Sequence, residues 1–185
     1  MTALPTVEDL AAVEEEKLLK LWEGLGYYSR ARNLQKAAKE VVARGGFPSD
    51  PKELATLPGI GGYTAGAIAS IAYQIPVPAV DGNVLRVITR VTADDSDIMK
   101  ESTKKSIEKW LFEIMNSVQD EKTRVFPGIF NQALMELGAT VCVPNGEPHC
   151  DKCPWYGLCE ARKQNCIAEI PVKTKAKARR IEKKT

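Results

Sequence analysis

The sequence predicts an all-α protein. Segments with apolar residues at the helical period alternate along the chain with Gly and Pro signals that end one helix or begin the next. No run alternates apolar and polar residues for long enough to indicate a β-strand, and no internal repeat is present. The 185 residues suffice for one large or two small domains, and 44% apolar with 27% charged side chains is typical of a globular protein.

Helices in the first half of the chain are predicted from their boundary signals. Thr6, followed three residues later by an acidic side chain, forms a capping box, and glycines shortly after the last apolar position end a helix. Asp50 before Pro51 marks another start, because Pro is favoured at the first helical position. These signals predict helices over 6–13, 15–22, 30–44 and a short one from 51.

A Pro-Gly turn interrupts this series at the centre of the chain. The run 57–61, Leu-Pro-Gly-Ile-Gly, is predicted to be a tight hairpin between two helices. A helix of small residues follows over 63–72, and 75–80 is expected to be extended because two prolines restrict it. The remaining predicted helices run from 82 through Ile88, over 101–115 with Trp110 facing inward, and over 127–137, where Gly138 ends the last one.

Charge and cysteine content narrow the function classes. The net charge is only +2, but residues 172–185 carry seven basic side chains against Glu182, which indicates either a polyanion partner or a solvated terminus. No run of about 18 apolar residues is present, and no signal peptide is read, so we expect no membrane association. Five cysteines without a secretory signal indicate a reducing compartment and favour metal binding or catalysis over disulfides.

Four of the five cysteines form one cluster with the pattern C-x7-C-x2-C-x5-C. Closely spaced thiolates on one loop can enclose an iron–sulfur cluster. Structural zinc usually takes two C-x2-C pairs and only one is present, so zinc is the second alternative. Cys166 is left over and is expected to be a buried or free thiol. The four candidate ligands are Cys142, Cys150, Cys153 and Cys159.

Several motifs, in this order, resemble one known family. The runs GLGYYSRARNL, LPGIGGYTAGAI, VDGNVLRV and FNQALMELGA, with the four-cysteine loop, are similar to the helix-hairpin-helix DNA glycosylases, and most of all to the adenine DNA glycosylases of the MutY type. The resemblance runs from about 5 to about 159. It implies an incomplete six-helix barrel lobe over 1–125, a last helix with a [4Fe–4S] loop over 126–166, and a basic tail over 167–185.

The resemblance implies how the chain would bind DNA. Backbone N–H groups of Gly59 and Gly61 would hold one phosphate, and carbonyls of the same hairpin would bind a monovalent cation, although an ordinary turn between helices is the alternative. Leu25 and Tyr27 match the positions that fill the duplex after the target base is flipped out. Alternatively, Tyr27 or Tyr28 covers the core.

The resemblance also implies a reaction, the hydrolysis of the N-glycosidic bond of adenine mispaired with 8-oxoguanine or guanine. The Asp81 carboxylate would stabilise positive charge on the sugar, with Asn83 orienting it, while the alternative role of Asp81 is an N-cap. Tyr63 stands where endonuclease III enzymes have a lysine that attacks the sugar. Since a phenol cannot form a Schiff base, Tyr63 near Asp81 indicates a monofunctional hydrolase, unless it is only a core tyrosine.

The chain departs from the family pattern in four ways. Family members have a glutamate, beside a Gln-Gln-Thr element, that protonates the leaving adenine, and this sequence contains no match to it. The family's N-terminal helices and its C-terminal Nudix-like domain have no match in this sequence either. We therefore expect a fragment that is inactive by itself. The first cysteine gap is x7 where x6 is usual.

The expected partner is double-stranded DNA with an adenine mispair, bound by a monomer in the bacterial cytoplasm at the nucleoid. Two other functions stay open: an endonuclease III-like glycosylase/lyase for oxidised pyrimidines, and a non-catalytic DNA-binding remnant.

Overall fold

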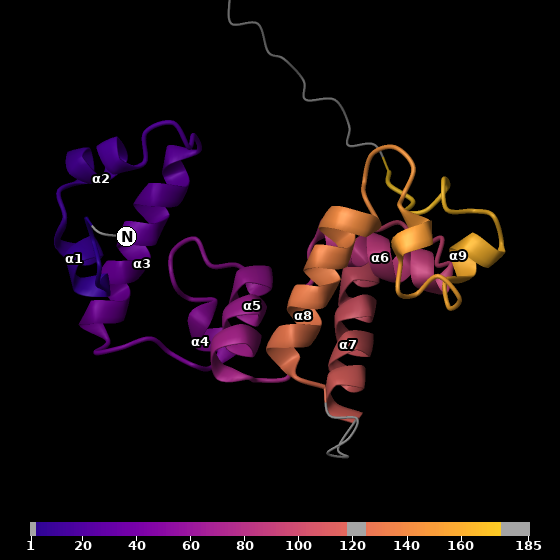
Figure 1. Cartoon of the computed structure of the whole chain (residues 1–185). Helices are drawn as coiled ribbons and strands as arrows, with labels where there is room; N and C mark the ends of the chain where they lie inside the picture. The colour runs from indigo at the N-terminus through magenta and orange to yellow at the C-terminus, as the bar shows by residue number, and fades with distance from the viewer. Residues whose placement is uncertain (1–2, 118–124, 175–185) are drawn as a thin grey trace, which may run out of the picture. The chain divides into compact units, whose positions relative to one another are not determined.

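The computed structural model describes residues 3–117 and 125–174, and within these ranges the chain is helical without a strand, as predicted (Figure 1). None of the helices in these ranges is long and apolar enough to cross a membrane. The predicted basic tail beyond 174 lies outside the described residues. The elements are α1 (Val7–Ala12), α2 (Glu15–Leu21), α3 (Tyr28–Ala43), α4 (Pro51–Leu54), α5 (Gly62–Tyr73), α6 (Gly82–Thr92), α7 (Glu101–Ser117), α8 (Pro127–Glu136), the π-helical turn η1 (Leu137–Val141), the 3₁₀ turn η2 (Cys150–Lys152) and α9 (Glu160–Lys163).

The chain divides into two compact units, each described by itself below. The first contains Met1–Ala79 and Ile114–Asn131, and the second contains Val80–Glu113 and Gln132–Thr185. The boundaries predicted at 125 and 166 stay a prediction.

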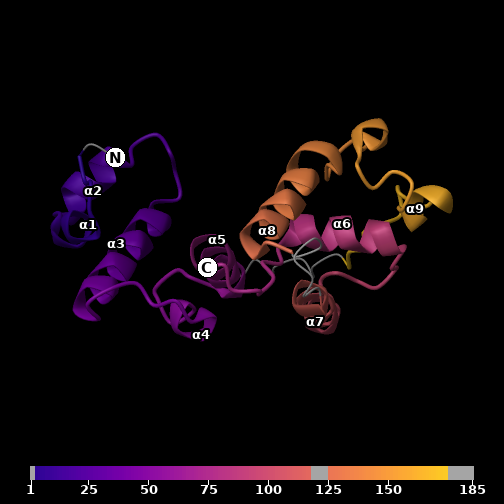
Figure 2. The same cartoon turned by 60° about the horizontal axis from the view of Figure 1, so that its bottom comes forward.

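In the first unit, α1 and α2 pack on α3, and α4 packs on α5 (Figure 2). Thr6 caps α1 through the predicted capping box with Asp9. Small side chains on α5 allow close packing: a Cβ atom at Gly66 would lie 2.4 Å from the Pro78 carbonyl oxygen of the extended segment. The core consists of Ala37, Val41, Leu54, Leu57, Ala65 and Ala69.

The extended segment 75–80 is held by one buried amide. The Asn131 side chain, 1% exposed, accepts a hydrogen bond from the Ala79 N–H at 3.1 Å. Its NH₂ group donates to the Val77 carbonyl at 2.9 Å and to the Ser70 hydroxyl at 2.8 Å. A segment without helix or sheet bonds needs such partners for its buried polar groups.

In the second unit, α6 packs against α9 and η1, and all its residues from Val84 to Arg90 are buried (Figures 1 and 2). The prediction that Trp110 faces inward is wrong: it is 42% exposed, because Ile107 and Leu111, four residues apart, define the buried stripe of α7. Gly138 was also predicted to end the last long helix, and it does not. The helical backbone continues after α8 through Gly138 as the wider π-helical turn η1.

Candidate functional site

The hairpin between α4 and α5 is a tight turn with one left-handed residue. The Ile60 N–H donates to the Leu57 carbonyl at 3.0 Å, and Gly59 has a φ of +79°. A Cβ atom at Gly59 would lie 2.7 Å from the Asn33 Cβ atom on α3, so both backbone conformation and space require glycine. Gly61 caps α5, and a Cβ atom there would meet nothing within 4 Å. An anion can therefore approach the N-terminus of α5, where backbone N–H groups favour it.

The loop between α2 and α3 exposes two large apolar side chains. Leu25 is 68% exposed and Tyr27 is 81% exposed, so Tyr27 does not cover the core. Three residues of this loop have left-handed backbones, with φ of +87° at Gly24, +66° at Gly26 and +47° at Tyr27. The Trp22 indole N–H donates to the Gly26 carbonyl at 2.9 Å and closes the loop.

Asp81 is the N-cap of α6, as the alternative reading of this residue predicted. Its Oδ1 atom accepts hydrogen bonds from the backbone N–H groups of Asn83 and Val84, both at 2.9 Å. Its Oδ2 atom accepts one from the Asn83 side-chain amide at 3.0 Å. The helix start therefore fixes the orientation of this carboxylate, and the cap is compatible with a chemical role because it concentrates negative charge at a defined position.

A buried arginine connects this carboxylate to the start of the cysteine loop. Arg86 is 3% exposed, and its Nη2 atom donates to the Asn83 side-chain oxygen at 2.8 Å and to the Gly138 carbonyl at 2.7 Å. Its Nε atom donates to the Cys142 carbonyl at 2.8 Å. A Cβ atom at Gly138 would lie 2.8 Å from the Asn83 Cβ atom, so the π-helical turn can approach α6 only with glycine there.

Electrostatics at Arg86 reflect this burial. Removal from water is the largest effect and lowers the pKa of the guanidinium, and the nearby positive charge of Arg90 lowers it further. The Cys142 sulfur and the Asp81 carboxylate raise the pKa, but the net shift is downward. An arginine stays protonated at neutral pH despite such shifts. The charge of Arg86 therefore remains one turn away from the Asp81 carboxylate.

The four cysteines predicted as ligands line one pocket. Cys142 follows η1, Cys150 begins η2, Cys153 ends it and Cys159 caps α9. Arg90 donates to the Cys142 sulfur at 3.3 Å, to the Val143 carbonyl at 3.2 Å and to the Ile170 carbonyl at 2.8 Å. The structure therefore brings the four sulfur atoms together around one space beside a buried cation.

The four thiols are donors of the kind that bind zinc or an iron–sulfur cluster. Within residues 3–117 and 125–174, no group of three or more His, Cys, Asp or Glu side chains is placed to hold a metal ion. Burial raises the pKa of the Cys150 and Cys153 thiols, and the neighbouring cysteines raise both further. A cationic group in the pocket would reverse this effect, since coordination requires thiolates.

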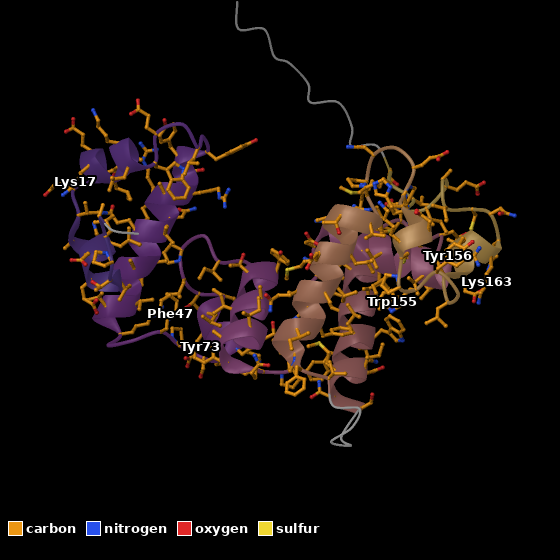
Figure 3. The ribbon with its side chains drawn as sticks, viewed as in Figure 1. Lys17, Phe47, Tyr73, Trp155, Tyr156 and Lys163 are labelled. Atoms are coloured by element: carbon orange, nitrogen blue, oxygen red, sulfur yellow. The ribbon has the colours of Figure 1, made fainter. Side chains whose placement is uncertain are left out.

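Aromatic and basic side chains surround the outer part of this loop. Trp155 and Tyr156 lie between the last two of the four cysteines in the sequence, and Figure 3 shows them together with Lys163 of α9. The Arg162 guanidinium stacks on the Tyr156 ring, 3.7 Å from its centroid, and Lys163 forms an ion pair with Glu160 at 2.7 Å. Cys166 is half-buried behind α9 and does not line the cysteine pocket.

The structure groups the predicted residues into four sets. Gly59 and Gly61 share the hairpin, Leu25 and Tyr27 share one loop, and Asp81 and Asn83 share one cap. The four cysteines share a pocket. Tyr63 lies in the first turn of α5, 36% exposed, and belongs to the first unit, whereas Asp81 belongs to the second.

Sequence reasoning missed the residues that hold these groups in place. Two of them carried a signal: Arg86 and Arg90 interrupt the apolar run of α6 four residues apart on one face, where a charged residue needs a buried partner. Asn33 and Gly138 depend on contacts between distant segments and carried none. The Trp22 bond to Gly26 spans only four residues, but no sequence pattern indicated it.

The sequence and the fold of this chain are both similar to those of known DNA repair proteins. The family model described as "HhH-GPD superfamily base excision DNA repair protein" matches residues 1–113. Proteins named adenine DNA glycosylase from rat and human are 45% and 47% identical to this chain over 89% of its length, and the chain spans 31% and 29% of theirs. A solved structure of an endonuclease III–DNA complex is 30% identical with a TM-score of 0.67, covering 89% of this chain and 72% of that one. The chain thus belongs to the HhH-GPD superfamily of base excision DNA repair proteins.

Proposed function

We propose that this chain is the catalytic part of a DNA glycosylase that hydrolyses the N-glycosidic bond of adenine mispaired with 8-oxoguanine or guanine. The identity of 45–47% to proteins named adenine DNA glycosylase supports adenine as the base. Tyr63 supports a monofunctional reaction, because the phenol cannot take the part of a Schiff-base lysine.

The observation that carries the proposal is the oriented Asp81 carboxylate. Cleavage of the glycosidic bond leaves positive charge on the deoxyribose, and a fixed carboxylate nearby stabilises it. Two backbone N–H groups and the Asn83 amide hold Asp81, and Arg86 in turn holds Asn83. The carboxylate therefore needs little reorganisation when the charge develops. The bond between the sugar C1′ and the adenine nitrogen breaks, and the oxygen of a water molecule adds to C1′. The proton that this water releases balances the proton that the departing adenine takes up.

Two exposed turns would bind the DNA. The hairpin N–H groups at Gly59 and Gly61 would hold a backbone phosphate, and its carbonyls a monovalent cation. Leu25 and Tyr27 would enter the duplex beside the flipped adenine, where an aromatic ring replaces lost stacking. Such elements fit a double-stranded DNA partner, bound by a monomer in the bacterial cytoplasm at the nucleoid.

The four pocket cysteines would hold a [4Fe–4S] cluster, which supplies a rigid cross-link between η1, η2 and α9. The sequence pattern supports the cluster over zinc, because structural zinc usually takes two C-x2-C pairs and only one is present. The hydrogen bond from Arg90 would hold the Cys142 sulfur in place.

The test is single-turnover release of adenine from a duplex with adenine opposite 8-oxoguanine, using the whole protein. Asp81→Asn should lower the rate about 10²- to 10³-fold. Asn is as good an N-cap as Asp, so the two backbone bonds remain and only the bond from the Asn83 amide is lost. The unfolding midpoint should therefore change little. The matched control is Asp50→Asn at the N-cap of α4, which should change neither quantity. Release at the wild-type rate by Asp81→Asn would contradict the proposal.

The similarity to endonuclease III–DNA complexes keeps a glycosylase/lyase as the second candidate. Borohydride treatment during turnover distinguishes the two, because only a lyase that uses an amine forms a trappable covalent adduct with DNA. We expect no adduct. Mismatch binding without release of any base would instead identify a non-catalytic DNA-binding protein.

A further inference from the structure

Tyr27 breaks two local preferences at once. It is the N-cap of α3 but makes no side-chain capping hydrogen bond, although Ser, Thr, Asp and Asn are favoured there. Its backbone is left-handed, with φ +47° and ψ +51°, a conformation costly for residues other than Gly, Asn and Asp. Tyr27 is unfavourable at this position in two ways and its side chain is 81% exposed, so it contributes little to the stability of the fold. A residue that breaks local preferences in this way indicates a functional role for its side chain.

The loop that carries Tyr27 therefore needs an external tether. Glycines occupy the other two left-handed positions of the loop, 24 and 26, where they adopt this conformation without strain. Glycine is equally free to adopt other backbone conformations, so these two residues do not fix the loop. Cβ atoms at either position would meet nothing within 4 Å, so packing does not restrict the loop there. Something other than backbone preference or close packing has to select one conformation.

The Trp22 side chain provides that tether. Its indole N–H donates to the Gly26 carbonyl at 2.9 Å, across the turn and one residue before Tyr27. Trp22 itself is fixed to α2, because its backbone N–H bonds to the carbonyl of Leu18, which is 3% exposed. The bond thus links the strained residue to the buried part of a helix through a rigid bicyclic ring.

We propose that Trp22 is a positioning residue for base extrusion: its indole N–H holds Tyr27 in the left-handed conformation that projects the ring toward the duplex. This inference rests on the proposed function, since it assumes that Tyr27 enters DNA. Without the bond, the loop samples other conformations, and each duplex insertion has to restore the strained one. A neutral hydrogen bond of ordinary strength corresponds to about a 3- to 10-fold change in the extrusion equilibrium.

Trp22→Phe in the whole protein tests this, because Phe keeps an aromatic ring but has no N–H donor. The probe is a duplex with 2-aminopurine in place of the adenine opposite 8-oxoguanine, whose fluorescence rises on extrusion. We expect Trp22→Phe to lower the extruded fraction about 3- to 10-fold. The slope of log binding constant against log salt should not change, because phosphate contacts remain. Trp110→Phe on α7 makes the same substitution at an exposed ring, whereas Trp22 is half-buried, and as the control it should match wild type.

A double-mutant cycle separates positioning from general structure. If Trp22 acts through the Tyr27 ring, Trp22→Phe should have no further effect on extrusion in a Tyr27→Ala background. If Trp22→Phe does not fold, Gly26→Ala provides the same test, since it disfavours the loop conformation without touching the indole. Normal extrusion by these variants would refute the role of Trp22 and leave the proposed function untouched. An equal effect of Trp22→Phe with and without the Tyr27 ring would do the same. A wild-type protein that neither extrudes the base nor releases adenine would refute the proposed function, and this role with it.

Discussion

The turns of the first unit and the start of α6 in the second unit hold their groups by different means. The hairpin and the loop between α2 and α3 depend on left-handed backbones at Gly59, Gly26 and Tyr27, with exposed surroundings. The Asp81 carboxylate depends instead on side-chain hydrogen bonds that reach the 3%-exposed Arg86 guanidinium. The turns are held by local backbone geometry and, at the Tyr27 loop, by the Trp22 indole bond, whereas the cap of α6 is held by satisfied buried polar groups.

This difference matches what each region would have to do. Turns that meet a phosphate or enter a duplex must present backbone or apolar atoms to solvent, so few side chains can hold them. A carboxylate that stabilises developing charge works best when it does not move, and buried hydrogen bonds provide that rigidity. The two regions should therefore respond very differently to mutation.

The largest effect is expected at Arg86. Arg86→Met removes three donated hydrogen bonds and leaves the Gly138 and Cys142 carbonyls without this partner in a buried site. We expect a loss of about 3 kcal/mol in the free energy of unfolding, measured with urea. Arg32→Met is the control: its ion pair with Glu15 is 2.7 Å long but exposed, and should be worth at most about 1 kcal/mol. Equal losses would show that burial does not distinguish the second region.

A second test addresses the link between Arg90 and the cysteine pocket. Arg90→Met removes the donor to the Cys142 sulfur, and comparable substitutions beside metal ligands lower metal affinity about 10- to 100-fold. For the proposed [4Fe–4S] cluster, iron release to a chelator, followed by absorbance, should accelerate by that factor. Lys152→Met, an exposed cation on the same loop, should release iron at the wild-type rate. If Arg90→Met also does so, the guanidinium does not hold the ligand.

The glycines of the first unit allow the two sources of turn rigidity to be separated. Gly59 and Gly45 both have left-handed backbones, with φ of +79° and +76°, but only a Cβ atom at Gly59 would collide with Asn33. Gly→Ala at either position should cost about 1 kcal/mol through backbone strain. Gly59→Ala should cost about 1 kcal/mol more, and Asn33→Gly, which removes the Cβ atom that Ala would keep, should remove that difference in urea unfolding. A difference that persists in the Asn33→Gly background would assign the extra cost to something else.

How far the sequence predicted this molecule depends on the range of the interactions. Local signals were sufficient for the helices: the capping box at Thr6, Pro51 after Asp50, and the capping by Asp81 all appear as predicted. The cysteine spacing predicted one shared pocket. These features depend on neighbours within one or two turns, so a local pattern contains the information.

Interactions between distant segments were not predicted. The widening of the helix at Gly138 depends on Arg86, 52 residues earlier, and the glycine at 59 is required by Asn33 on another helix. Trp110 was assigned inward because it is apolar, but only the packed structure shows which stripe of α7 is buried. The residues that support the site were therefore harder to predict than those that form it.

The smallest effect is expected where a side-chain hydrogen bond is exposed. The Thr174 hydroxyl and N–H both donate to the Asp97 carboxylate, joining the last described residues to the turn before α7. The hydroxyl of Thr174, then the Met99 N–H, lower the pKa of Asp97 below its ordinary value of 3.8. A lowered pKa means that this contribution is present above pH 3.8 and is lost as the pH falls through the lower folded value.

The Thr174 amide resonance should therefore shift on acidification below about pH 4, before global unfolding, and Asp97→Asn should show the shifted position at neutral pH. Asp94→Asn is the matched control, because Asp94 accepts a hydrogen bond only from Ser96 among the bonds described here. Global stability should hardly change in either variant, since solvent screens exposed groups. A large loss of stability in Asp97→Asn would mean that side-chain hydrogen bonds hold the second unit even where water competes, and burial would no longer explain the contrast between the two regions.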